Sequence, residues 1–117
     1  MSRIAIHGFG RIGRSLMKAA LKDDLFVPVS ISDIKDIGTL AALFEVDSNY
    51  GRWPEPVSVT GEGFAIGGRA IPYFDSLKAL PDWRALDVDL VIDCTGRATT
   101  RAGAQVHLDA GAKRVLV

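Results

Sequence analysis

The spacing of apolar residues changes near residue 11, and the change predicts a strand followed by a helix. A short apolar run interrupted by glycine, RIAIHGFG over residues 3–10, is typical of a buried strand. In residues 11–24, RIGRSLMKAALKDD, the apolar positions Ile12, Leu16 and Ala19/Ala20 share one face of a helix, and the basic residues lie largely elsewhere. The chain therefore opens with a β-α unit.

The remaining apolar pattern continues this alternation, with one antiparallel interruption. We expect a strand over 25–32, a helix over 36–46, a loop over 47–56, an antiparallel meander over 56–74, a short helical turn over 76–83, a strand over 89–96, a helix over 101–110 and a final strand over 113–117. Thr99 or Thr100 is expected to cap the last helix, and Gly111 to end it.

The resulting order, β-α-β-α-(meander)-β-α-β, predicts one α/β domain over residues 1–117. Alternating strands and helices form a doubly wound parallel sheet, with helices on both faces and right-handed crossovers. In such a sheet a ligand binds at the carboxyl ends of the strands, where the strand order reverses. The stretches GFGRIG and CTG, which follow the first and fourth strands of this order, both reach that edge.

Three glycines at the first strand-to-helix junction predict a nucleotide site. Gly8, Gly10 and Gly13 have the spacing G-x-G-x-x-G, which is typical of Rossmann-type dinucleotide-binding folds. Gly8 permits the tight turn, Gly10 lets a pyrophosphate approach the backbone, and Gly13 lets the helix lie close to the strand. The helix N-terminus adds free N–H groups and a partial positive charge.

An acidic residue after the second strand strengthens this prediction. Asp33 stands 20 residues beyond Gly13, at the end of the second apolar run. An acid at this position accepts hydrogen bonds from the ribose hydroxyls of adenosine. Two plainer interpretations stay open: the glycines form an ordinary tight turn, and Asp33 caps the helix that begins near Asp36.

Composition and charge exclude several other classes. The chain has 117 residues, of which 48% are hydrophobic and 24% are charged, as in a globular domain. Its 14 basic residues balance 14 acidic ones, so there is no electrostatic reason to expect a nucleic-acid or membrane partner. The single cysteine cannot form an internal disulfide, and no apolar run is long enough to span a membrane. We expect a cytoplasmic protein.

Five separated segments of the chain match one known family in order and spacing. They are HGFGRIGRSLMKAAL, ISD, VDSNYGRWP, DVDLVIDCTG and HLDAGAKRVLV. Together they closely resemble the N-terminal part of glyceraldehyde-3-phosphate dehydrogenases. The resemblance implies an NAD-dependent, phosphorylating aldehyde dehydrogenase that is cytoplasmic and usually tetrameric. It also implies that glyceraldehyde 3-phosphate binds only with a further domain, whose catalytic cysteine segment would lie beyond Val117.

The same resemblance implies which residues hold NAD. By position, Arg11 and Ile12 bind the pyrophosphate through backbone N–H groups, and Asp33 binds the adenosine ribose. The turn CTG lines the adenine side. The full set of expected cofactor-binding residues is Gly8, Phe9, Gly10, Arg11, Ile12, Gly13, Asp33, Cys94, Thr95 and Gly96. No catalytic residue and no metal ligand is expected in this chain.

Departures from the family pattern bear on affinity at the adenine end more than on the fold. His7 stands where the family usually has asparagine, and Ala98 where it often has an aromatic residue. The segment YFDSLKAL, near which a basic residue often helps to hold adenine, is shortened. The segment DCTG also resembles the corresponding segment of erythrose-4-phosphate dehydrogenases. The Ser-Asp pair at residues 32–33 instead favours a glyceraldehyde-3-phosphate dehydrogenase.

Other residues with chemical potential receive structural interpretations. Cys94 is expected to be a buried, inert thiol beside the cofactor, because no histidine is near it in sequence. His107 is expected to be half-exposed on the last helix, and His7 to have a satisfied structural role. Arg11 and Arg14 either pair with phosphate or solvate the helix.

Three functions remain open from the sequence. The chain is the cofactor-binding part of a dehydrogenase, a stand-alone nucleotide-binding module, or a truncated product without function. We expect a preference for NAD over NADP because Asp33 would repel a 2′-phosphate, although Lys35 softens the repulsion. We also expect the final strand to be an exposed edge that favours a homo-oligomer or another partner chain.

Overall fold

Apart from the short helical turn over 76–83, the strands and helices expected from the apolar pattern are present in the computed structural model, which describes residues 2–47, 51–96 and 101–117. The elements are β1 (Arg3–His7), α1 (Arg11–Asp23), β2 (Val27–Asp33), α2 (Ile37–Glu45), β3 (Val46–Asp47), β4 (Gly51–Arg52), β5 (Val57–Val59), β6 (Gly63–Ile66), β7 (Arg69–Asp75), β8 (Leu90–Asp93), α3 (Arg101–Asp109) and β9 (Arg114–Leu116). Within these residues, no helix is both long enough and apolar enough to cross a membrane.

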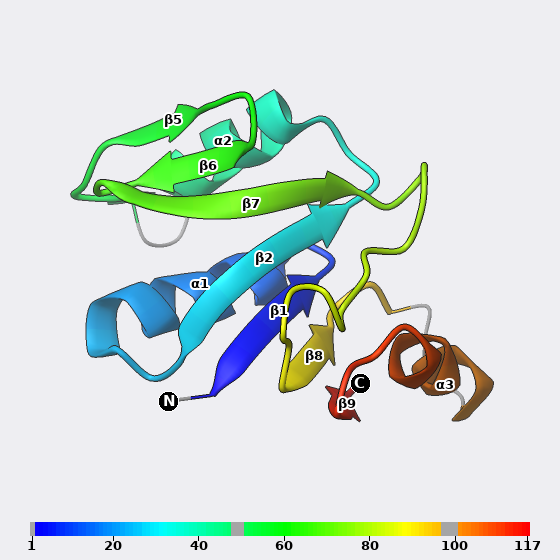
Figure 1. The fold of residues 1–117 in the computed structure, drawn as a ribbon. Coiled ribbons are helices and arrows are strands. Elements are labelled where there is room, and N and C mark those ends of the chain that lie inside the picture. Colours follow the sequence, from blue (N-terminus) through cyan, green and yellow to red (C-terminus); the bar gives the residue numbers. More distant parts are fainter. Residues whose placement is uncertain (1, 48–50, 97–100) are drawn as a thin grey trace.

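A single twisted sheet organises the molecule (Figure 1). Its strand order is β5-β6-β7-β2-β1-β8-β9. The five strands from β7 to β9 are paired in parallel, whereas β5, β6 and β7 are paired antiparallel. The meander is therefore continuous with the parallel sheet through β7, which confirms the doubly wound α/β fold with an antiparallel insertion.

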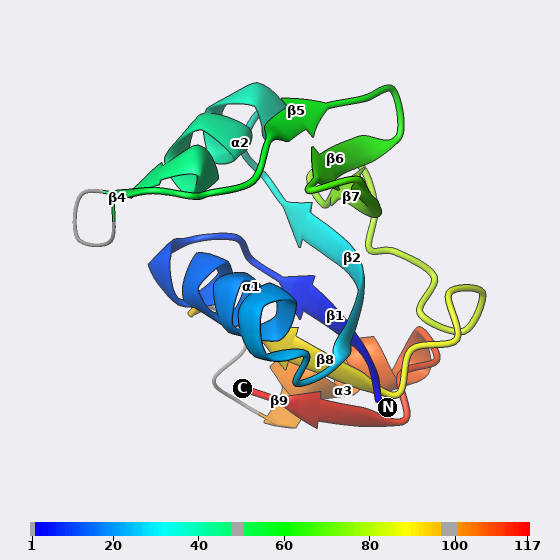
Figure 2. The ribbon, with the colours of Figure 1, turned by 90° about the vertical axis from the view of Figure 1, so that its left-hand side faces the viewer.

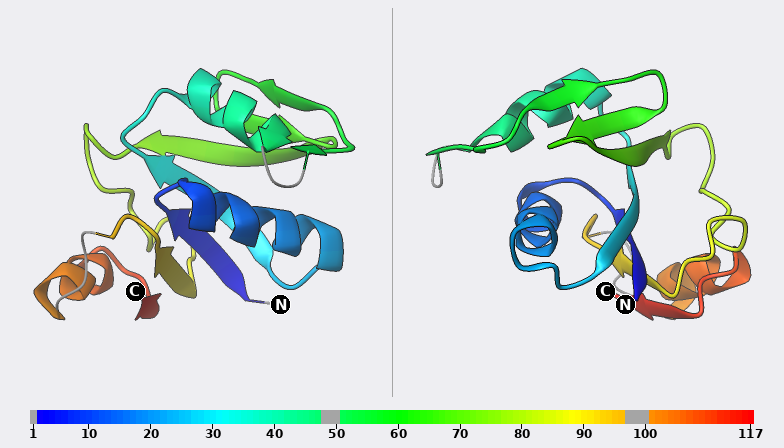
Figure 3. Two further views of the ribbon diagram at one scale, coloured as in Figure 1. Left: turned by 180° about the vertical axis from the view of Figure 1, so that it is seen from behind. Right: turned by 60° about the vertical axis from the view of Figure 1, so that its left-hand side comes forward.

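Helices cover the sheet on both faces. Helices α1 and α2 lie on one face, and α3 lies on the other with the segment 76–89 (Figures 2 and 3). Alternate residues of β1 reach the two cores: Ile4 and Ile6 pack in the core under α1 and α2, while Ala5 packs in the core with Trp83. Burial on both faces explains why the central strands read as continuous apolar runs.

Helix α1 packs against the core through Ala20 and partly through Leu16, as the apolar pattern predicts, but not through Ile12. Gly13, Met17 and Ala20 are its buried residues, whereas Ile12 is 67% exposed. Ile12 lies in the first turn of α1 and does not contact the core. Its exposed side chain lies next to the glycine turn.

The connecting segments differ in detail from the sequence expectations. The loop over 47–56 contains β4, which pairs with β3 in a two-stranded ribbon. The segment 76–83 forms turns and no helix, and Trp83 fills the core from it. Gly111 ends α3 with φ +108°, and a Cβ there would lie 2.4 Å from the Arg84 Cβ. The caps expected at Thr99 or Thr100 lie outside the described residues.

Candidate functional site

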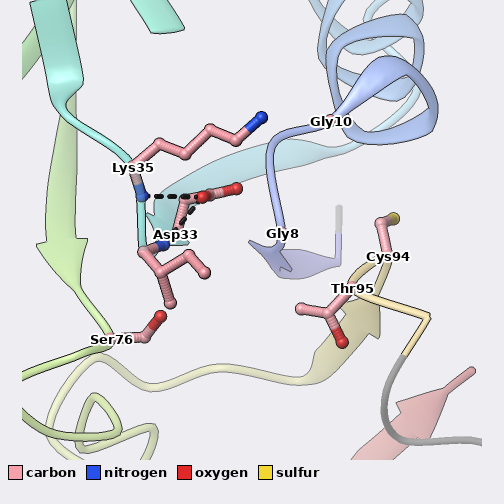
Figure 4. Close-up of a pocket in the computed structure, with 8 residues that line it drawn as sticks. Gly8, Gly10, Asp33, Lys35, Ser76, Cys94 and Thr95 are labelled. Atoms are coloured by element: carbon pink, nitrogen blue, oxygen red, sulfur yellow. Dashed lines mark hydrogen bonds between the residues drawn. The ribbon is translucent and has the colours of Figure 1, made fainter. Parts of the chain in front are cut away.

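A pocket opens at the carboxyl ends of β1, β2 and β8. The chain leaves β1 toward β2 on one side, and β8 joins β1 from the other, so the strand order reverses here. The pocket has a volume of about 180 Å³. Its lining residues are Gly8, Gly10, Asp33, Ile34, Lys35, Ser76, Cys94 and Thr95 (Figure 4).

Two of the three motif glycines are required by close contacts between backbones. Gly8 has φ +98°, and a Cβ on it would lie 2.8 Å from the Thr95 backbone nitrogen. A Cβ on Gly13 would lie 2.3 Å from the Gly8 carbonyl oxygen. The predicted tight turn at Gly8 and close helix-to-strand packing at Gly13 are therefore confirmed.

Gly10 has a different geometry, because it leaves open space at the start of α1. Apart from Gly10 and its two chain neighbours, no heavy atom of the described residues lies within 4 Å of the position that a Gly10 Cβ would take. Gly10 is the N-cap residue of α1, and as a glycine it has no side chain that could accept a backbone N–H of the first turn. Its carbonyl accepts the N–H of Arg14 at 2.9 Å. The N–H groups of the first turn, including those of Arg11 and Ile12, have no partner within the helix. Backbone N–H groups without a partner in the helix, next to open space, form a favourable binding site for an anion.

Three backbone N–H groups hold the Asp33 carboxylate. Its Oδ2 accepts from Phe9 at 2.6 Å, and its Oδ1 accepts from Ile34 at 2.7 Å and from Lys35 at 2.9 Å. A carboxylate has about four acceptor positions, so room for one further donor remains. Figure 4 shows Asp33 between the Lys35 backbone and the glycine turn.

The alternative interpretation of Asp33 as a helix cap is wrong. The side chain of Asp36 caps α2 by accepting the N–H of Thr39 at 3.1 Å. Asp33 instead ties the end of β2 to the turn after β1.

Phe9, one of the expected cofactor contacts, has its side chain in the core, and its contact with the cofactor stays a prediction. Its side chain is fully buried and packs against Phe44 and Phe64, with ring centroids 5.9 and 5.5 Å away. Its N–H is donated to Asp33, and its carbonyl accepts from Arg14 Nη1 at 3.1 Å. Phe9 therefore anchors the glycine turn to the core and does not line the pocket.

Gly13 is buried in α1, and the remaining expected residues fall into two groups. Gly8, Gly10, Asp33, Cys94 and Thr95 line the pocket. Arg11 and Ile12 are exposed on the first turn of α1, and Gly96 is exposed at the turn after β8 with φ +75°.

Sequence reasoning did not assign Tyr73 and Ser76 to this site, and it considered Lys35 only as a charge near Asp33. Tyr73 Oη donates to the Lys35 carbonyl at 2.5 Å and lies 3.1 Å from the Asp33 carbonyl. The Ser76 N–H also donates to the Asp33 carbonyl, at 3.0 Å. Burial, followed by the carboxylates of Asp33 and Asp75, raises the pKa of Tyr73 to about 12. Only the pairing of β7 with β2 creates these contacts.

Asp93 organises the opposite wall of the pocket. Its Oδ1 accepts from the Thr95 N–H at 2.9 Å and from Thr95 Oγ1 at 2.6 Å. Its Oδ2 lies 2.8 Å from His107 Nε2. Burial raises the pKa of the Asp93 carboxyl, but the hydrogen bonds from His107 and Thr95 outweigh it and bring the pKa to about 2. Asp93 is therefore an ionised, buried acceptor.

The expectation of a half-exposed His107 is wrong. The residue is only 3% exposed, because α3 packs it against Trp83, whose Nε1 donates to His107 Nδ1 at 3.1 Å. His7 lies beside it, with ring centroids 4.9 Å apart, and its Nδ1 is 2.6 Å from Ser32 Oγ. The structural role expected for His7 agrees with this contact.

The Cys94 thiol is half-buried at the pocket wall. Burial, and then the charge of Asp93, raises the pKa of this thiol. The thiol is therefore protonated at neutral pH and is a weak nucleophile. This agrees with the expectation of an inert cysteine.

Comparisons with known proteins agree with this geometry. A sequence model described as "Glyceraldehyde 3-phosphate dehydrogenase, NAD binding domain" matches residues 2–101. The glyceraldehyde-3-phosphate dehydrogenase of Kitasatospora aureofaciens is 44% identical over 120 residues, which cover 100% of this chain and 36% of that protein. Those of Geobacillus stearothermophilus and Chlamydia pneumoniae are 41% and 42% identical, and each match covers 98% of this chain and 35% of the relative. The chain spans about a third of the length of these relatives. It belongs to the glyceraldehyde-3-phosphate dehydrogenase family and represents the family's NAD-binding domain.

Proposed function

We propose that this chain holds NAD for a phosphorylating glyceraldehyde-3-phosphate dehydrogenase, with the pyrophosphate at the first turn of α1 and the adenosine ribose at Asp33. The observation that carries the proposal is the position of the Asp33 carboxylate beside the open space at Gly10. Hydrogen bonds from Phe9 and Lys35 fix that carboxylate in place. Membership in the NAD-binding family supports the same assignment.

The start of α1 supplies the pyrophosphate site. The N–H groups of Arg11 and Ile12 lie at the positive end of the helix dipole. The dipole stabilises an exposed anion at this end by roughly 0.3–1 kcal/mol. The first turn, RIGR, carries no acidic residue that would compete with a phosphate. Gly10 leaves the approach to these donors open.

The Asp33 side chain supplies the ribose site. It retains about one acceptor position after its three backbone bonds, and a ribose hydroxyl is a donor of the right kind. A 2′-phosphate would replace that donor with negative charge. The proposal therefore includes a preference for NAD over NADP.

The turn after β8 supplies the adenine side, through Cys94, Thr95 and Gly96. When bound, NAD would supply the hydride acceptor for a dehydrogenase reaction. The residues of this chain bind and orient the adenosine half of the cofactor. Glyceraldehyde 3-phosphate is the proposed substrate of the longer enzyme.

The direct test is calorimetric titration of the purified chain with NAD. Binding is expected in the wild type, and Gly10→Val should abolish it because a branched side chain fills the open space. Gly61→Val is the matched control: Gly61 also has open space around its Cβ position among the described residues, but it lies in the meander. Folded wild-type protein that does not bind NAD would refute the proposal, as would equal losses in the two variants.

We further propose that the protein is a cytoplasmic homo-oligomer. Strand β9 pairs only with β8 and ends the described sheet. An edge strand with exposed Leu116 can accept another chain. Light scattering after gel filtration checks this proposal, and a monomer at all concentrations would contradict it.

A further inference from the structure

A chain of buried hydrogen bonds runs from the second core to the pocket wall. It begins at Trp83 Nε1, passes through both ring nitrogens of His107 and through Asp93, and ends at Thr95. The side chains of His107 and Asp93 are 4% and 3% exposed. Water therefore does not compete for these bonds.

The chemistry of the indole fixes the direction of every bond in this chain. An indole N–H can only donate, so His107 Nδ1 must accept and carries no proton. The imidazole proton is then on Nε2, where it is donated to Asp93 Oδ2. The second oxygen, Oδ1, is left for the N–H and hydroxyl of Thr95.

We propose that Trp83 and His107 are positioning residues that fix the turn 94–96 against the glycine turn. The inference rests on the proposed function, in which this turn lines the adenine side. Thr95 lies so close to Gly8 that a Cβ on Gly8 would be 2.8 Å from the Thr95 nitrogen. The orientation of Asp93 therefore determines the position of the turn 94–96 relative to the glycine turn on the other side of the pocket.

His7 completes the surroundings of this network without joining the chain of bonds. It is paired with Asp93 in the β1–β8 register and contacts Ser32 from β2. Burial is the main cause that lowers the pKa of His7, partly offset by Asp93. A neutral His7 leaves Asp93 as the anion in the middle of the network.

A divalent cation is the competing interpretation, because His7, Asp93 and His107 offer ligand atoms within 4.8 Å of one another. A cation on His107 Nε2 would displace the proton to Nδ1. That proton would then face the N–H of Trp83, so that two donors would oppose each other. Trp83 thus favours a proton over a metal at this position.

The experiment uses the 15N-labelled chain and three readouts: the His107 tautomer from long-range 1H–15N correlation, hydrogen exchange at the Thr95 amide, and NAD affinity. The wild type should show His107 protonated on Nε2 alone. His107→Leu should speed Thr95 exchange by about tenfold to a hundredfold, since it removes a hydrogen bond to a charged acceptor. NAD affinity should fall by about fivefold or more. His107→Gln should recover most of both losses, because its amide N–H can reach Asp93.

Two further variants separate positioning from a general loss of stability. Trp83→Phe keeps a ring but removes the Nε1 donor, so His107 should stay protonated on Nε2, toward the Asp93 carboxylate, while Thr95 exchange speeds up less than in His107→Leu. Ser30→Ala removes a fully buried hydroxyl that has no partner among the described residues, and it should leave Thr95 exchange unchanged. Equal effects of Ser30→Ala and His107→Leu would overturn the inference.

Several other outcomes are decisive. A wild-type His107 protonated on Nδ1, or a tautomer that responds to micromolar Zn²⁺, would overturn the assigned network. Unchanged Thr95 exchange or NAD affinity in folded His107→Leu would overturn the positioning role. If the wild type does not bind NAD, the proposed function fails, while the tautomer and exchange readouts still decide whether the network holds the turn.

Discussion

The carboxylate of Asp33 and the backbone N–H of Phe9 are joined by a 2.6 Å hydrogen bond that connects the end of β2 to the turn after β1. The bond gives Asp33 two functions at once. It stabilises the glycine turn, and it aims the carboxylate into the pocket. A change at this residue should therefore affect both folding and ligand affinity.

Asp33→Asn should weaken NAD binding and also lower the free energy of unfolding by about 1–3 kcal/mol. The amide has only one acceptor oxygen, so its NH2 group would face the N–H of either Phe9 or Lys35. Urea denaturation measures the stability, and calorimetry measures the affinity. Asp82→Asn is the control, because Asp82 accepts from Arg84 and Ala85 through Oδ1 alone. If Asp33→Asn behaves like this control, the double function is wrong.

Tyr73→Phe should loosen the turn of residues 33–35 while leaving the packing of the ring in place. The phenol donates to the Lys35 carbonyl at 2.5 Å, and a neutral hydrogen bond of this kind contributes about 0.5–1.5 kcal/mol. We expect a stability loss in that range and a few-fold weaker affinity for NAD. Unchanged affinity with reduced stability would show that Tyr73 supports the sheet but not the site.

The sequence predicted the first half of the site because its determinants are local. The spacing of Gly8, Gly10 and Gly13 specifies a turn and a helix start within a few residues. The position of Asp33 follows from one β-α-β unit. Local pattern and tertiary structure agree there, so the geometry could be predicted residue by residue.

The rest of the site depends on contacts between distant segments. The pairing of Ile31 with Tyr73 places Tyr73 and Ser76 beside Asp33, and no local pattern reports this pairing. His107 stands in RAGAQVHLDA, a stretch that mixes apolar and polar residues, and its burial depends on Trp83 from another segment. The motif spacing also does not report that the Phe9 side chain fits a core that includes residues of α2 and β6.

Stability should fall as the pH drops below 6.5 because of His7. Burial lowers the pKa of His7 in the folded state below the ordinary value of 6.5, despite the charges of Asp93 and Asp33. The unfolded chain therefore binds a proton more readily than the folded one, and the stability from a neutral His7 is complete only above that value. Urea denaturation at pH 7.5 and 5.5 should show this loss. His7→Asn should remove the part that His7 contributes.

A second loss of stability should appear at lower pH and belongs to Asp93. The pKa of its carboxyl is lowered from 3.8 to about 2 in the folded state. Its contribution is therefore complete above the unfolded value and is lost as the pH falls through the range between the two. Asp93→Asn should flatten the acid limb of the stability profile relative to the wild type. An unchanged acid limb would show that other carboxyl groups dominate it.

Lys35 should moderate the cofactor preference without reversing it. Its side chain lines the pocket beside Asp33 (Figure 4), so an ammonium group is available to a 2′-phosphate that the carboxylate repels. We expect the wild type to bind NAD about tenfold to a hundredfold more tightly than NADP, since a hydrogen bond to a charged group is worth roughly 1.5–3 kcal/mol. Lys35→Ala should weaken NADP binding more than NAD binding and so widen this ratio. Calorimetric titrations with both cofactors, repeated at high salt, measure the ratio. Equal losses for the two cofactors would show that Lys35 acts on their shared phosphates instead.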